Sequence, residues 1–206
     1  MHARVQMTRT LPDRVNTPEA SGYFIKILEG HPGFQGVHLM RQIGSRQGLS
    51  VTLWDSREDA GAASDRTEQV MGPRPFTLDF DEVYDVLAVT PGLAAIDKAT
   101  VAQVTGFDGP RSAAQVHAMR RAGEERIRPV VEHVHGHAAT YVLCHPVDSA
   151  IVVITLATSI DALNGIADAV LSTSLLPGED PALLTGPDRI ELYTHEAHSL
   201  AEAPVA

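Results

Sequence analysis

The sequence predicts an α+β protein in which two βαββαβ units follow one another along the chain. Two observations support this prediction. An offset of 102 residues aligns the two halves without a gap from about residue 31 to residue 60, and each half has the order strand, helix, strand, strand, helix, strand. The aligned halves share few identical residues, so the prediction depends on the matching order of elements. We place the first unit at residues 1–90 and the second, more diverged unit at residues 91–206.

The first unit begins with a strand over residues 3–9, where polar and apolar residues alternate. Asn16-Thr17-Pro18-Glu19 then provides a helix cap, a proline for the first turn and an acidic residue that favours the helix N-terminus. The helix presents one apolar stripe at i, i+3, i+4, i+7 and i+8, formed by Ala20, Tyr23, Phe24, Ile27 and Leu28. Gly30 and Pro32 are expected to end it.

Two short strands are predicted next, over residues 36–43 and 49–54, joined by the glycine-containing loop GSRQG. Ser56-Arg57-Glu58-Asp59 resembles a capping box and predicts a second helix that runs to about Met71. A last strand is expected over residues 77–87.

The second unit repeats this plan, with a connection at residues 90–100. We expect strands at 99–104, 139–145, 150–157 and 189–195, and helices that begin near Ser112 and Ser159. The second of these helices has the same apolar spacing as the first helix of the chain. Pro129 should kink or end the other helix.

Each unit therefore has a four-stranded antiparallel sheet with helices on one face, the ferredoxin-like arrangement. The uncovered faces need burial, and packing them against each other would give a pseudo-dimeric α+β barrel with a central cavity. Fusion of the two units already supplies the contact of a dimer. We therefore expect a monomer or a weak homodimer.

Charge and composition exclude several functions. The net charge of −10 opposes binding to nucleic acid, and no apolar run is long enough to span a membrane. The N-terminal residues lack the features of a signal peptide, and the single cysteine, Cys144, cannot form an internal disulfide. A cytoplasmic protein is expected, with Cys144 as a buried structural thiol.

The segment GFQGVHLMRQIGSRQGLSVTLWDSREDAGAASDRT, residues 33–67, resembles the antibiotic biosynthesis monooxygenase family of dimeric α+β barrels. Its most specific part is Trp54-Asp55-Ser56-Arg57-Glu58-Asp59-Ala60, which is similar to the W-x-S-x-E-A signature of the family. The second unit has Leu156-Ala157-Thr158-Ser159-Ile160-Asp161-Ala162 in its place and so lacks this signature.

The resemblance implies a cofactor-independent monooxygenase of a small aromatic, polyketide or quinol substrate, with no bound cofactor. The alternative is a non-catalytic barrel that binds a hydrophobic metabolite. Haem-degrading relatives use an asparagine in the first strand and a tryptophan and a histidine in the second helix. This chain has Val5, Gln6 and Met7 in the first strand, and its second predicted helix contains neither tryptophan nor histidine, so haem degradation is disfavoured.

Candidate site residues follow from the alternation of side chains along strands. If Leu49, Val51 and Leu53 face the helices, then Ser50, Thr52 and Trp54 face the cavity. In the preceding strand His38, Met40 and Gln42 face inward by the same argument. In the second unit the inward positions are mostly aliphatic, for example Val152, Ile154 and Leu156. This contrast places the ligand in the first unit.

His38 is the candidate catalytic base, because an imidazole titrates near neutral pH and could deprotonate a phenol. Trp54, Gln42, Thr52 and Met40 are the candidate substrate-binding residues. Trp54 and His38 each have a purely structural interpretation as well. The Trp54 ring could simply fill the end of the barrel, and His38 could be a buried structural histidine.

The run His133-Val134-His135-Gly136-His137 raises the question of a metal site. Its aligned position is the loop between helix and strand, and no cysteine or histidine pair lies at a fixed spacing from it. We therefore expect a solvated loop and no metal.

Overall fold

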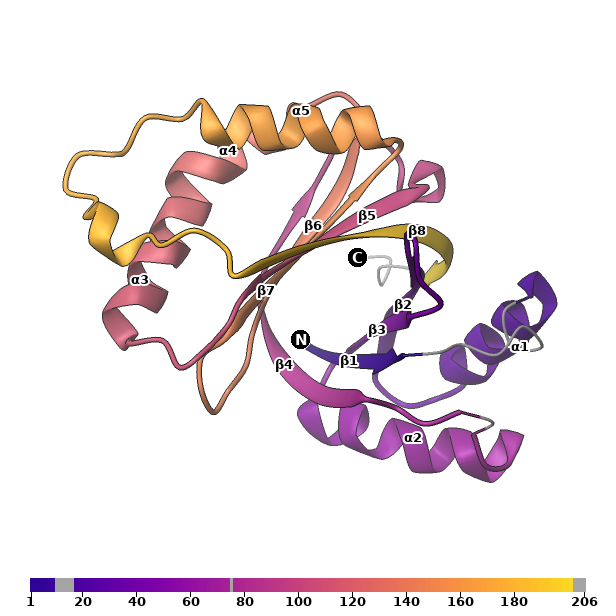
Figure 1. The fold of residues 1–206 in the computed structure, drawn as a ribbon. Helices are drawn as coiled ribbons and strands as arrows, with labels where there is room; N and C mark the ends of the chain where they lie inside the picture. Colours follow the sequence, from indigo (N-terminus) through magenta and orange to yellow (C-terminus); the bar gives the residue numbers. More distant parts are fainter. Residues whose placement is uncertain (10–16, 75, 202–206) are drawn as a thin grey trace, which may run out of the picture. The chain divides into compact units, whose positions relative to one another are not determined.

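A computed structural model describes residues 1–9, 17–74 and 76–201 of the chain (Figure 1). Two compact units are present. The first comprises Met1–Asp85 together with the C-terminal residues from Thr194, and the second comprises Val86–Tyr193. The division differs from the expected one at residues 90 and 91, because the boundaries fall inside the two longest strands and the end of the chain belongs to the first unit.

The first unit follows the predicted element order. It contains β1 (His2–Thr8), α1 (Pro18–Glu29), β2 (Phe34–Gln42), β3 (Gly48–Trp54), α2 (Arg57–Met71) and the first half of β4 (Phe80–Pro91). The strand order is β4–β1–β3–β2, with the second half of β8 (Arg189–Leu200) next to β2. All three pairings among β1 to β4 are antiparallel, so this is the ferredoxin-like sheet.

Local signals in the sequence account for the two helices of this unit. The Thr17 side chain accepts a hydrogen bond from the backbone N–H of Ala20 at 3.2 Å and so caps α1, with Pro18 in the first turn. Ser56 accepts from the N–H of Asp59 at 3.0 Å and caps α2. The predicted contribution of Asn16 lies outside the described residues.

The second unit has the same topology. Its elements are β5 (Val101–Phe107), α3 (Ala113–Arg121), the π-helical segment η3 (Ala122–Ile127), α4 (Arg128–Val131), β6 (His137–Cys144), β7 (Ile151–Ala157) and α5 (Ile160–Leu171), with short 3-10 turns η2 (Ile96–Lys98) and η4 (Pro181–Leu183). The strand order is β5–β7–β6, with the first half of β8 next to β5 and the second half of β4 next to β6. The fold class predicted from the sequence, two ferredoxin-like units in tandem, is confirmed.

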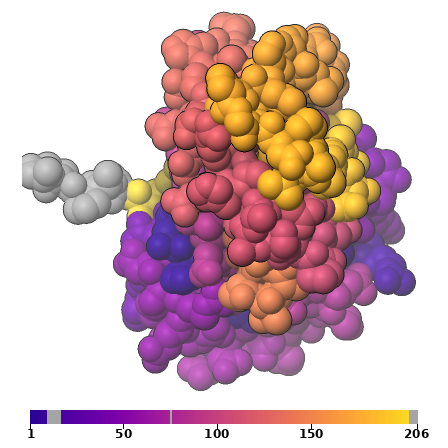
Figure 2. Space-filling view, turned by 90° about the vertical axis from the view of Figure 1, so that its left-hand side faces the viewer, coloured from indigo at the N-terminus to yellow at the C-terminus, as the bar shows by residue number. Residues whose placement is uncertain are grey.

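Pro129 was predicted to kink or end the first helical region of the second unit, and the helix does not end there. α3 passes through the π-helical turn η3 into α4, whose first turn contains Pro129, so the helical geometry changes directly before the proline. From η3 the Arg126 side chain forms a buried ion pair with Glu179 at 3.0 Å. Arg121 of α3 also donates a hydrogen bond to the Pro177 carbonyl. These contacts hold segment 172–188, coloured orange to yellow in Figure 2, against the helical region.

The structural offset between the units is 103 residues, so the alignment at 102 was wrong by one position. β7 begins at residue 151 and β3 at residue 48, and the helix caps Ser159 and Ser56 keep the same difference. Gly33 and Gly136 correspond as well, and both have positive φ, at 71° and 84°. These glycines fit the turn before each second strand because they have no Cβ to oppose that conformation.

Helices cover one face of each sheet. In the first unit Leu28 of α1 and Ala60 and Ala63 of α2 pack on Val37 and Trp54. In the second unit Leu163 and Ile166 of α5 pack on Val101 and Ala157, together with Val131 of α4. At the offset of 102, the inward positions His38, Met40 and Gln42 correspond to Thr140, Val142 and Cys144. These three residues instead share the helix-covered face with Ala157, because Thr140 pairs with Thr155.

One predicted strand orientation in the first unit is also wrong. Val37 pairs with Thr52 and His38 pairs with Val51, so Ser50, Thr52 and Trp54 face the helices while Leu49, Val51 and Leu53 face away. The prediction failed because it assumed that the more apolar side of β3 must be the helix-covered one. The orientation predicted for β2, with Val37 toward the helices and His38 away from them, is confirmed.

Among the described residues, no helix is both long and apolar enough to cross a membrane.

Candidate functional site

The first unit contains a cavity of about 510 Å³ between its sheet and helices α1 and α2. Its apolar wall includes Phe24, Leu28, Leu39, Trp54, Met71 and Phe76. Its polar lining includes Arg4, Gln6, Ser21, Ser50, Thr52, Ser64, Thr67, Arg74 and Glu196. The volume is typical of a site for a small organic molecule.

Trp54 forms the inner wall of this cavity. The side chain is fully buried, and its indole N–H donates to Thr52 Oγ1 at 2.8 Å. Phe34 contacts the ring edge-on with centroids 5.6 Å apart, and His31 stacks on it at 6.4 Å. These contacts hold the indole in one orientation, so it is a rigid part of the cavity wall.

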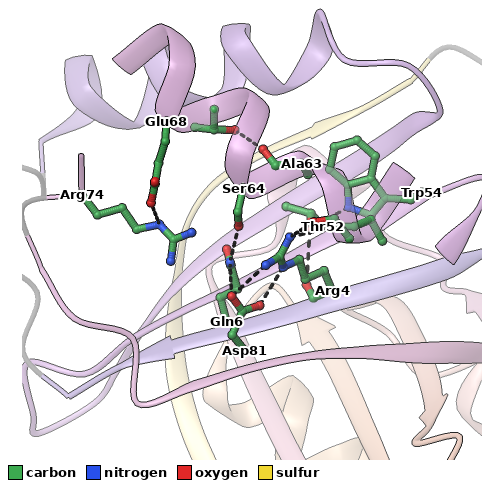
Figure 3. Close-up of polar contacts among 12 residues, drawn as sticks. Arg4, Gln6, Thr52, Trp54, Ala63, Ser64, Glu68, Arg74 and Asp81 are labelled. Atoms are coloured by element: carbon green, nitrogen blue, oxygen red, sulfur yellow. Dashed lines mark hydrogen bonds and ion pairs between the residues drawn. The ribbon is translucent and has the colours of Figure 1, made fainter. Parts of the chain in front are cut away.

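A polar network crosses the floor of the cavity (Figure 3). Arg4 donates to both carboxylate oxygens of Asp81, from Nε at 2.6 Å and from Nη2 at 2.8 Å, and its Nη1 donates to two backbone carbonyls of α2. The Gln6 amide donates to Asp81 at 3.0 Å and to Ser64 at 3.2 Å. These hydrogen bonds link β1, β4 and α2 beside the cavity.

Burial by itself would raise the pKa of Asp81. The hydrogen bonds from Arg4 and Gln6 and the positive charge of Arg4 outweigh that effect and lower the pKa below its ordinary value. Asp81 is therefore held as an anion at neutral pH, and its charge is matched by Arg4.

Glu196 brings a carboxylate to the cavity from β8, the last strand of the chain. Arg41 on β2 holds it through an ion pair in which Nε lies 2.9 Å from Oε1. Arg41 pairs with Gly48 on β3, and Trp54 is at the opposite end of that strand. Glu196 and Trp54 therefore lie toward opposite ends of the cavity.

The structure brings some of the predicted site residues together and separates others. Trp54 and Thr52 line the cavity from the helix-covered face. Met40 borders it from β2, although it pairs with Leu49 and so belongs to the same sheet face as His38. Gln42 is not among the lining residues, and its side chain accepts a hydrogen bond from Ser45 at 2.7 Å. His38 lies on the sheet face opposite Trp54, so the expectation that both face one cavity is wrong.

His38 belongs to a group of three imidazoles on that opposite face. It is 1% exposed, and its Nδ1 lies 3.1 Å from Nε2 of His195, whose ring stacks on His198. Burial, and then the positive charges that His195 and His198 can carry, lower the pKa of His38 to about 3. His38 is therefore neutral across the physiological range.

Sequence reasoning missed Arg4, Gln6, Ser64, Arg74 and Glu196. A signal for two of them was present, since Arg4, Gln6 and Thr8 alternate with apolar residues along β1 and so form one polar stripe. Arg74 and Glu196 could not be found in this way, because their approach to the cavity depends on the loop after α2 and on the pairing of the final strand.

Two other predictions concern the second unit. His137 begins β6 and is 0% exposed, so it does not belong to a solvated loop, whereas His133 and His135 precede the strand. Cys144 at the other end of β6 is half-buried and not fully buried.

The fold and the cavity define a class of ferredoxin-like α+β proteins with an internal cavity. No family model matches the chain, and no curated protein matches it in sequence.

Solved structures do match it. An anthrone oxidase-like protein aligns with 100% of this chain and 95% of its own, at 15% identity and a TM-score of 0.58. A Fusobacterium nucleatum protein, described provisionally as a monooxygenase, covers 97% of this chain and 94% of its own, at 10% identity and a TM-score of 0.66. A Listeria monocytogenes ferredoxin-fold protein related to antibiotic biosynthesis monooxygenases covers 95% of both chains, at 11% identity and a TM-score of 0.52. The resemblance to the antibiotic biosynthesis monooxygenases is thus confirmed at the level of the fold.

Proposed function

We propose that the first unit binds a small aromatic or quinol substrate in the cavity beneath α1 and α2, and that the protein oxygenates it without a bound cofactor. The observation that carries the proposal is the cavity itself, in which a fixed indole and aliphatic side chains face a few polar groups. The match over the whole chain to an anthrone oxidase-like protein supports the choice of substrate class.

An anthrone illustrates the reaction. A base removes one proton from the methylene carbon between the rings, and the electron pair passes to dioxygen, which forms a carbon–oxygen bond and a peroxide. Cleavage of the O–O bond with loss of the second methylene hydrogen gives the quinone carbonyl and hydroxide, which the protonated base converts to water. The substrate supplies all the electrons, so that CH₂ and O₂ become C=O and H₂O.

Among the described lining residues, Glu196 is the carboxylate that can accept this proton, and Arg41 holds it in place. We assign it this role in the proposal. The base role predicted for His38 stays a prediction, and the position of His38 on the other face of the sheet is the reason for choosing Glu196 here.

Binding without turnover is the second candidate function. The observation that favours it is that the ion pair with Arg41 already occupies Glu196. Under this alternative, ligand would quench the fluorescence of Trp54, but no oxygen would be consumed.

We expect Ser21→Phe to weaken the binding of anthrone-like ligands roughly tenfold, about 1.4 kcal/mol, because the new ring occupies part of the cavity. Ser21 lies on α1 and lines the cavity, whereas the next residue, Gly22, is exposed with nothing within 4 Å of an added Cβ. Gly22→Phe is therefore the matched control. Titration of Trp54 fluorescence measures binding, and an oxygen electrode measures turnover with anthrones and hydroquinones.

The two variants separate the possible outcomes. Quenching that Ser21→Phe weakens and Gly22→Phe leaves unchanged, together with oxygen uptake that depends on Glu196, supports the proposal. Quenching without uptake selects the binding function. Equal affinities of both variants and the unaltered protein would refute this location for the site.

A further inference from the structure

Arg74 places a positive charge at the cavity that the surrounding structure leaves weakly matched. It follows α2 in the loop that leads to β4, and its side chain lines the cavity while 28% exposed. Among the described residues it forms an ion pair with Glu68, in which Nε and Oε1 are 3.4 Å apart and the Glu68 side chain is 46% exposed. A guanidinium has five N–H donors, and this long, exposed contact engages few of them.

The other lining charges are already balanced. Arg4 is joined to Asp81 by two hydrogen bonds of 2.6 and 2.8 Å, and Glu196 is held by Arg41 at 2.9 Å. Arg74 is therefore the residual charge of the cavity, although the chain as a whole has a net charge of −10. A cation retained in this position against the overall charge favours an anionic ligand group.

The direction of the Arg74 side chain also favours a role in the cavity. Figure 3 shows Arg74 extending from its loop toward the group formed by Gln6 and Asp81 beneath α2. The positive charge of Arg74 also contributes to the lowered pKa of Asp81, after the contributions of burial, Arg4 and Gln6, which is consistent with its proximity.

The sheet register gives the distance between the aromatic wall and Asp81, the residue toward which Arg74 extends. Asp81 pairs with Gln6, and Gln6 pairs with Ser50, which precedes Trp54 by four positions on β3. At about 3.3 Å for each residue of a strand, the Asp81 row lies roughly 13 Å from the Trp54 row. Two or three fused rings lying along the apolar wall between these rows could reach Arg74 through a carboxylate substituent.

We propose that the ligand is an aromatic acid, whose rings lie along the apolar wall of the cavity and whose carboxylate is bound by Arg74. The inference rests on the proposed function for the location of the site, and it adds the substrate class and a residue that determines specificity. An arginine fork fits a carboxylate because it can donate two parallel hydrogen bonds.

Two ligands of nearly the same shape test this inference: anthraquinone-2-carboxylate and anthraquinone-2-carboxamide. Quenching of Trp54 fluorescence reports the affinity for each. We expect the unaltered protein to bind the carboxylate about tenfold more tightly than the carboxamide. Arg74→Gln should abolish this preference and leave the affinity for the carboxamide unchanged, and Arg74→Lys should retain part of it.

Arg66→Gln is the control, because Arg66 lies within α2, pairs with Asp59 at 3.6 Å and does not line the cavity. The preference should persist in this variant and should decline with added salt in the unaltered protein. Equal binding of both ligands by the unaltered protein, or a preference that survives Arg74→Gln, would overturn the inference and leave the proposed function standing. Absence of quenching by either ligand would overturn both.

Discussion

Replacing Arg4 with methionine is expected to lower the free energy of unfolding by about 3 kcal/mol, at the lower end of what removal of one partner from a buried ion pair costs. The side chains of Arg4 and Asp81 are 12% and 27% exposed, so the remaining carboxylate would be only partly solvated. The two backbone carbonyls of α2 that accept from Arg4 would lose their donor as well. Urea denaturation followed by circular dichroism at pH 7 measures the change.

The chain offers a matched control at Arg57. Its Nη2 lies 2.6 Å from Asp85, the same separation as between Arg4 and Asp81, but these side chains are 41% and 44% exposed. Arg57→Met should therefore cost less than about 1 kcal/mol. In the double variant Arg4→Met with Asp81→Leu, both charges are gone, and we expect at least half of the lost stability to return. Equal losses in Arg4→Met and Arg57→Met would show that burial does not strengthen the pair.

The fold was predictable because each element carries its own local signal. The cap at Ser56 and the apolar stripe of α1 determine helices, and the loop GSRQG determines a hairpin, whatever the rest of the chain does. The offset of 102 failed because a matching order of elements does not determine an alignment to the single residue, whereas the helix caps and the positive-φ glycines define the true spacing of 103.

The site was harder to predict because it depends on which face of β3 the helices cover. Leu49, Val51 and Leu53 suggested an apolar helix-facing side, but both faces of this strand are buried, so hydrophobicity alone cannot distinguish them. The bulky Trp54 faces α1 and α2, where the small residues Ala60 and Ala63 leave room for it. The pairing of β3 with β2 is what shows that Trp54 and His38 lie on opposite faces of the sheet.

His38 gives the second large expected effect, a loss of stability in mild acid. Its pKa is lowered from 6.5 to about 3 in the folded protein by burial and by the neighbouring His195 and His198. Between these two values the unfolded chain binds a proton at this position and the folded chain does not. Stability therefore falls as the pH drops below 6.5, by about 1.4 kcal/mol for each pH unit and about 2 kcal/mol at pH 5.

His38→Gln should remove this dependence, because glutamine carries no charge at any of these pH values and its amide can still form a hydrogen bond with His195. Denaturant unfolding at pH 7, 6 and 5 should show that the variant loses about 2 kcal/mol less than the unaltered protein over this range. His117→Gln is the control, since His117 is an exposed histidine on α3 and its removal should leave the pH dependence unchanged. Asp81 and the buried His137 contribute acid sensitivity to all three proteins, so the difference between variants isolates His38. Parallel pH profiles for His38→Gln and the unaltered protein would mean that the imidazole of His38 accepts its proton in the folded state as readily as in the unfolded chain.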